Sequence, residues 1–144
     1  MHKTTAILVA RLIFAGVFVM AAGFKFAGMQ ATASYIASAG FPLASVLAWA
    51  AAIFESAIAI ALLTGVFFSE TAVLAVGYVL FLAFAFHGPS HWNANQTEFG
   101  FFVDHFTFIA GLLFAAMYGP GQVLVAGRPQ HAVANAANVL PMSG

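Results

Sequence analysis

The chain has 144 residues, of which 63% are apolar and 6% are charged, and four Lys or Arg balance four Asp or Glu. Soluble domains carry about 25% charged residues, so this composition excludes a soluble globular domain and a disordered chain. The zero net charge excludes a nucleic-acid-binding protein, which needs a basic surface to neutralise phosphates. The sequence has no Cys, which excludes disulfides, thiolate metal sites and a cysteine nucleophile. A small integral membrane protein remains.

Four apolar runs set the expected fold. A membrane-spanning helix needs about 20 mostly apolar residues. The runs cover residues 5–27, 45–64, 70–86 (or 71–86) and 100–118. Gly65, Gly88-Pro89 and Gly119-Pro120-Gly121 follow the second, third and fourth runs as stop signals. The sequence therefore predicts an all-α membrane protein, an antiparallel up-down bundle of four transmembrane helices.

The segments outside these runs complete the expected organisation. Residues 30–41 are semi-polar and predict a short interfacial helix, residues 66–69 a tight turn, and residues 87–99 a polar loop. We expect residues 1–121 to form one transmembrane domain and residues 122–144 a short, poorly ordered tail. Arg11 and the bulky Met20 disfavour a cleavable signal peptide in the first run.

Three of the runs place their charged residues on a face with small residues. Charged side chains inside a bilayer are costly and usually face the bundle interior, and small residues let helices approach closely. The faces are Arg11, Ala15, Phe18, Ala22 and Lys25 in the first run, Ala48, Ala52, Glu55 and Ala59 in the second, and Gly100, Asp104, Thr107 and Gly111 in the fourth. The pattern predicts that all three faces point inward.

Five titratable side chains are expected to converge in the half of the membrane away from the termini. With a rise of about 1.5 Å per residue and alternating helix directions, they fall at similar depths. They are Lys25, Glu55, His87, Asp104 and His105. Glu55 lies mid-helix, so it needs a proton or a partner, for which Lys25, Arg11 and the His residues are available. The alternatives are that Lys25 only reaches toward the interface and that His87 only caps its helix.

A metal site is the competing interpretation of the same region. His87 and His91 are four residues apart, and Glu98, Asp104 and His105 follow. That spacing serves a metal only if residues 87–91 are helical, and Gly88-Pro89 opposes a helix there. We therefore predict no metal ligands.

A set of short motifs carries a resemblance to a known family. In chain order they are Gly23-Phe24-Lys25-Phe26, Gly40-Phe41-Pro42, Glu55, Leu63-Thr64-Gly65, Ala85-Phe86-His87, Ala110-Gly111-Leu112-Leu113 and Gly119-Pro120-Gly121. Over about residues 7 to 121 the chain resembles the DoxX family of small four-helix bacterial inner-membrane proteins. Relatives include quinone-reducing thiosulfate oxidoreductase subunits, so the resemblance implies an inner-membrane location and a redox-linked role. The family's Lys, Glu and His positions match Lys25, Glu55 and His87, whereas Asp104-His105 stands where relatives often carry Lys-Asn.

Three functions are compatible with these features. The first is an accessory or quinone-linked subunit of a membrane redox system, with Glu55, His87 and His105 as catalytic residues and Lys25 and Asp104 as ligand-binding residues. A redox role needs a quinone or a redox partner subunit, because the sequence has no Cys and no haem or Rossmann signature. The alternatives are a structural or assembly subunit without chemistry and a small-molecule permeation module, which would need to form a homo-oligomer.

The distribution of positive charge predicts the topology. Lys3, Arg11 and Arg128 fall on the side of the termini, and Lys25 alone falls on the other side. The positive-inside rule then places both termini in the cytoplasm. Topology reporters fused at Gly121 and in the loop around His91 should give opposite readings. Identical readings at the two positions would refute the arrangement.

Overall fold

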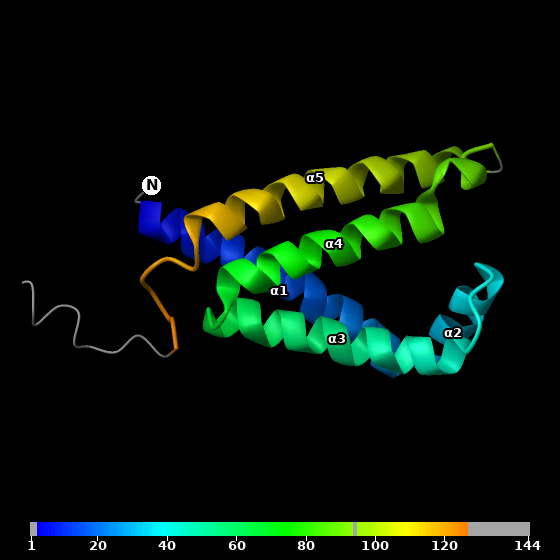
Figure 1. Cartoon of the computed structure of the whole chain (residues 1–144), viewed down its shortest axis with the longest axis horizontal. Helices are drawn as coiled ribbons and strands as arrows, with labels where there is room; N and C mark the ends of the chain where they lie inside the picture. Colours follow the sequence, from blue (N-terminus) through cyan, green and yellow to red (C-terminus); the bar gives the residue numbers. More distant parts are fainter. Residues whose placement is uncertain (1–2, 94, 127–144) are drawn as a thin grey trace, which may run out of the picture.

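The chain folds into an up-down bundle of long helices. The computed structural model describes residues 3–93 and 95–126. Its elements are α1 (Lys3–Ala27), α2 (Met29–Ser38), α3 (Ala44–Thr64), α4 (Phe68–His87), the 3-10 helix η1 (Pro89–His91) and α5 (Gln96–Tyr118). Within the described residues, α1, α3, α4 and α5 are long and apolar enough to span a membrane, and they alternate in direction (Figure 1). The predicted four-helix transmembrane bundle is confirmed.

The element boundaries follow local sequence signals. α5 begins at Gln96, four residues before the predicted start, because the Asn95 side chain accepts a hydrogen bond from the Thr97 backbone N–H at 3.0 Å and caps the first turn. α3 ends at Thr64 and is followed by Gly65, whose φ of 73° lies in the left-handed region that glycine adopts readily. A helix also forms over most of the predicted segment 30–41: α2 begins one residue before it and turns back at one end of the bundle (Figure 1).

The bundle consists of two helix pairs. α1 packs mainly against α3, and α4 packs mainly against α5, whereas α3 and α4 contact each other less. Figure 1 shows α3 and α4 close together at their shared turn and further apart toward α2. We call the end with the α3–α4 turn the terminal end, because the start of α1 and the end of α5 also lie there, and the opposite end the α2 end.

The inward faces of α1 and α3 are those that the sequence predicts. Ala15 on α1 and Ala48 and Ala52 on α3 are fully buried, and Phe18 and Ala22 are nearly so. Small side chains at these positions allow the two helix backbones to approach closely. The outer surface instead carries large exposed apolar side chains, which suits contact with lipid acyl chains.

The predicted inward face of α5 is wrong at Gly100, Asp104 and Thr107, whereas Gly111 of that face does pack closely against Phe14. Asp104 and Thr107 are exposed, and the helix buries Ile109 and Leu112 instead. Phe108 packs against the same apolar core. Branched and aromatic side chains bury more apolar area than Gly or Thr, so they decide which face of α5 meets α4.

A buried arginine fixes the segment that follows α5. Arg11 is 1% exposed, and its guanidinium donates hydrogen bonds to the backbone oxygens of Pro120 at 2.8 Å and Leu124 at 2.9 Å. The Ala126 N–H donates to the oxygen of Thr64 at 2.8 Å. The first residues of the predicted tail therefore pack against the terminal end, and residues 127–144 of that tail lie outside the described residues.

Gly88 provides a test of the end of α4. A Cβ at Gly88 would lie 2.6 Å from the Phe84 backbone oxygen, whereas one at Gly77 in the same helix would meet nothing within 4 Å. We expect Gly88→Ala to lower the free energy of unfolding by roughly 1–3 kcal/mol, because backbone must shift. Gly77→Ala should be neutral or stabilising by up to about 1 kcal/mol. Thermal melting in detergent checks both, and equal melting temperatures would contradict the expectation.

Candidate functional site

A buried carboxylate joins three helices at the centre of the bundle. Glu55 on α3 is 1% exposed. Nζ of Lys25 on α1 lies 2.8 Å from both carboxylate oxygens and donates a hydrogen bond to Oε1. The hydroxyl of Tyr78 on α4 also donates to Oε1, at 2.7 Å. Glu55 thus has a charged partner as expected, and of the candidates Lys25, Arg11 and the His residues the partner is Lys25. We call Lys25, Glu55 and Tyr78 the triad.

The triad distributes its contacts unevenly over the carboxylate. Oε1 accepts both hydrogen bonds, whereas Oε2 is in ionic contact with Nζ and accepts no hydrogen bond from the described residues. The Lys25 side chain is 22% exposed, so its ammonium group connects the buried carboxylate to the surface of the site. The site therefore holds a carboxylate whose Oε1 is fully hydrogen-bonded and whose Oε2 has only the ionic contact with Lys25.

Tyr78 is a member of the site that the sequence interpretation missed. Its position in the middle of an apolar run is the signal that could have identified it. Tyrosines in membrane helices concentrate at the interfaces, and a buried hydroxyl away from them needs a hydrogen-bond partner.

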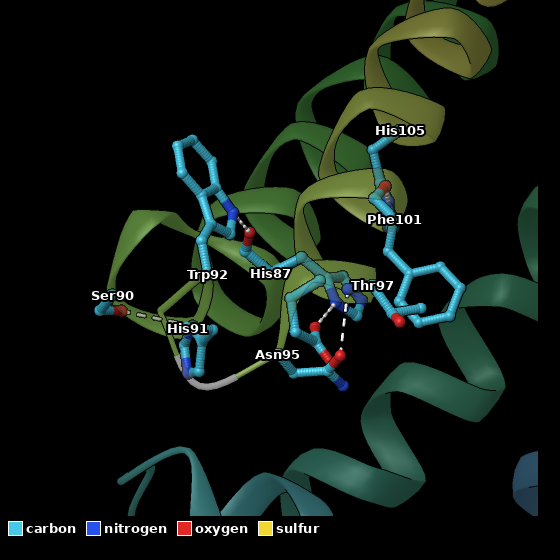
Figure 2. Close-up of polar contacts among 9 residues, drawn as sticks. His87, Ser90, His91, Trp92, Asn95, Thr97, Phe101 and His105 are labelled. Atoms are coloured by element: carbon cyan, nitrogen blue, oxygen red, sulfur yellow. Dashed lines mark hydrogen bonds and ion pairs between the residues drawn. The ribbon is translucent and has the colours of Figure 1, made fainter.

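A second polar group lies at the connection between α4 and α5. His87 Nδ1 lies 2.6 Å from Glu98 Oε2, and His105 Nδ1 lies 2.6 Å from the Phe101 backbone oxygen. The two imidazole rings are 5.1 Å apart between centroids. Figure 2 shows how Trp92 holds the end of α4, its indole N–H donating to the His87 backbone oxygen at 2.9 Å.

These contacts fix which ring nitrogens remain available. A backbone oxygen and a carboxylate only accept hydrogen bonds, so Nδ1 of His87 and of His105 carries the hydrogen. In the neutral form of each ring, Nε2 is then left as an acceptor. The pair can thus accept hydrogen bonds from a ligand or take up protons.

The spacing of His87 and His91 does not create a metal site in the described residues. α4 ends at His87, and His91 lies in η1, where its ring nitrogen contacts the Ser90 hydroxyl at 3.3 Å (Figure 2). Across residues 3–93 and 95–126, no three His, Asp or Glu side chains come together as a metal-binding group.

A cavity of about 870 Å³ lies between the two helix pairs and connects the two polar groups. Its polar lining comes from Lys25, Thr32, Tyr35, Tyr78, His87 and His105. Its apolar walls combine small and aliphatic side chains with aromatic ones, which are Phe24, Tyr35, Phe41, Phe54, Phe81 and Phe86. Lys25 and Tyr78 thus face the cavity with Glu55 behind them, whereas Asp104 does not line it. Of the five predicted site residues, the structure brings three to the cavity and places Glu55 one contact away.

Aromatic contacts from α2 and the segment after it cover part of this cavity. Tyr35 stacks on Phe86 with ring centroids 5.1 Å apart, and Phe41 contacts Phe81 and Phe86 at 5.9 Å. Burial, followed by the negative charge of Glu98, raises the pKa of the Tyr35 phenol. The phenol therefore stays protonated at neutral pH and keeps its hydrogen for donation.

These features define a multi-pass integral membrane protein with a polar-ended, aromatic cavity among its helices. A family model described as DoxX matches residues 6–88, more than half of the chain. The chain therefore belongs to the DoxX family. The match ends directly after α4, so α5 with His105 and Asp104 lies beyond it. No curated protein and no solved structure matches the chain.

The triad predicts a large effect of removing its carboxylate. Glu55→Leu leaves Lys25 without its counter-ion, and breaking a buried ion pair costs several kcal/mol. Because Lys25 is partly exposed, we expect a loss of roughly 2–4 kcal/mol in the free energy of unfolding. Thermal or denaturant unfolding in detergent measures this loss.

Two further variants control the measurement. Glu70 is exposed in the first turn of α4, so Glu70→Leu should change stability little. Tyr78→Phe removes only the hydroxyl and should cost about 1.5–3 kcal/mol, as is usual for a hydrogen bond to a charged group. If Glu55→Leu and Glu70→Leu melted at the same temperature, the ion pair would not stabilise the bundle.

Proposed function

We propose that the chain binds a quinone-type ligand in the cavity and acts as an accessory, quinone-linked subunit of a membrane redox system. We also propose that it resides in the bacterial inner membrane with both termini in the cytoplasm, which would place the α2 end on the outer side. The observation that carries the proposal is the cavity, which combines aromatic walls with hydrogen-bonding groups at separate positions.

The size and lining of the cavity fit such a ligand. Small-molecule pockets typically enclose roughly 300–1,000 Å³ and are mostly apolar with a few polar groups, as this cavity is. A quinone has a flat ring that packs between aromatic side chains and two carbonyl oxygens that accept hydrogen bonds. Lys25 and Tyr35 have hydrogens to donate, and Nε2 of His87 and His105 can accept them from ring hydroxyls. A bound quinone would carry electrons and protons between its oxidised and reduced forms.

The residues of the site have distinct proposed roles. Lys25 binds the ligand and also pairs with the Glu55 carboxylate. Glu55 holds or releases a proton within the triad, with Tyr78 and Lys25 connecting it to the cavity. His87 and His105 exchange protons at the other polar group, where Glu98 orients the His87 ring. A redox partner subunit is required to pass electrons, because the sequence has no Cys or haem motif to carry them.

The triad also supports a second candidate function. It joins α1, α3 and α4, and one buried polar group is enough to fix how helices align in a membrane. A structural or assembly subunit would use the triad in this way without any ligand. The cavity distinguishes the two, since a purely structural role does not require it.

Ligand-dependent stability tests the proposal. A quinone added at about 100 times its dissociation constant should stabilise the wild-type protein by about 2.7 kcal/mol. Ala51 lines the cavity, so the ring introduced by Ala51→Phe occupies ligand space and should abolish this stabilisation. Ala57→Phe adds the same ring at an exposed position of α3 and should retain the stabilisation. Thermal shift with a series of quinones of different ring and tail length provides the measurement.

Complementation separates the two candidate functions. In a deletion strain, Glu55→Gln should fold and be expressed but fail to restore growth, because Gln keeps the shape of the side chain and cannot ionise. His87→Ala and His105→Ala should also fail. Full complementation by all three variants, together with no quinone-dependent shift, would favour the structural role.

A further inference from the structure

Asp104 is an acidic residue inside the spanning part of α5 whose side chain is exposed on the outer surface of the bundle. It lies three residues before the midpoint of α5, about 5 Å along an axis that rises about 1.5 Å per residue, so it falls well inside the spanning segment. The residue is exposed on the outside of the bundle. An ionised carboxylate facing lipid acyl chains is strongly unfavourable, and acidic residues in spanning helices normally face a polar partner.

The basic groups of the described spanning helices have other partners. Between Thr4 and Tyr118, α1, α4 and α5 contain four Lys, Arg or His side chains. Each has its own contact: Lys25 with Glu55, Arg11 with two backbone oxygens, His87 with Glu98, and His105 with the Phe101 oxygen. A second copy would bring these four groups in the same contacts, so the described spanning helices offer Asp104 no uncommitted cation. An ion pair with the Asp104 carboxylate therefore needs a cation from a different molecule.

The surroundings of Asp104 suit a neighbouring helix. α5 is the least buried of the described spanning helices. In its apolar 18-residue stretch 11% of the residues are buried, against 22–33% in the other three helices. Gly100 and Thr107 lie one turn to either side of Asp104 and are exposed too. A Cβ at Gly100 would meet nothing within 4 Å, so the chain itself does not fill this space. Small residues around a charged one let another backbone approach closely.

We propose that the face of α5 formed by Gly100, Asp104 and Thr107 binds a membrane-spanning helix of another chain that carries Lys or Arg at matching depth. The pair would neutralise Asp104 inside the membrane, and Gly100 would admit the approaching helix. The inference deepens the proposed function, on which it rests for the identity of the complex, by assigning the surface that meets the partner subunit. The cavity lies between the helix pairs, so ligand and partner would bind at different places.

A model helix tests the recognition directly. The full chain carrying a donor dye is reconstituted in neutral phosphatidylcholine vesicles with an acceptor-labelled Leu/Ala helix of about 20 residues containing one central Lys. From energy transfer, we expect this helix to associate at least about tenfold more tightly than one with a central Leu. Asp104→Asn should reduce that preference to less than about twofold, whereas Glu70→Gln, which removes an exposed charge elsewhere, should keep it.

Further variants make the result decisive. Gly100→Leu should weaken association by blocking close approach, and Gly77→Leu on α4 should not, since both positions are otherwise open. Equal association of the Lys and Leu helices with the wild-type chain would overturn the proposal. Disulfide-linked homodimers of Thr107→Cys in the Cys-free chain would also overturn it, because they would assign the face to a second copy. Ala51→Phe should leave association intact, so failure of quinone binding and failure of this surface are distinguishable.

Discussion

One carboxylate buried in the middle of a membrane bundle constrains much of this structure. Glu55 can be ionised there only if a cation and hydrogen-bond donors surround it. Lys25 and Tyr78 meet that need from two different helices, at 2.8 Å and 2.7 Å. Their contacts fix the depth of α1 and α4 relative to α3 and join the α1–α3 pair to α4. The register of the helices thus follows from neutralising a single charge.

The cavity is a consequence of the same constraint. The triad holds the helix pairs together at mid-depth, while α3 and α4 diverge toward the α2 end (Figure 1). Side chains of α2 and α4 stack across part of the space that opens, and His87 and His105 line its other polar region. The space has a volume of about 870 Å³, which lies in the range that small-molecule pockets enclose.

Periodicity predicted the faces of α1 and α3 because their charged residues must avoid lipid and their small residues lie on the same stripe. The need of Glu55 for a partner followed from the same reasoning, but the choice of Lys25 over Arg11 and the His residues required the structure. The face of α5 could not be predicted in this way, because Phe108, Ile109 and Leu112 outweigh Gly and Thr in packing. Tyr78 could not be predicted, because the partner of its hydroxyl depends on the relative depth of α3 and α4, which the sequence alone does not give.

The two acidic residues near the midpoints of their helices show two solutions to one physical problem. Glu55 is neutralised within the chain, at the cost of committing Lys25 and Tyr78 to it. Asp104 is exposed, and the basic side chains of the described spanning helices are engaged elsewhere. A lipid environment tolerates neither charge alone. The ion pair of Glu55 with Lys25 stabilises the arrangement of helices within the bundle. The exposed Asp104 carboxylate instead favours a positively charged group next to the outer face of α5. The contrast between the two residues is the reason for proposing that the Asp104 face of α5 meets a helix of another chain.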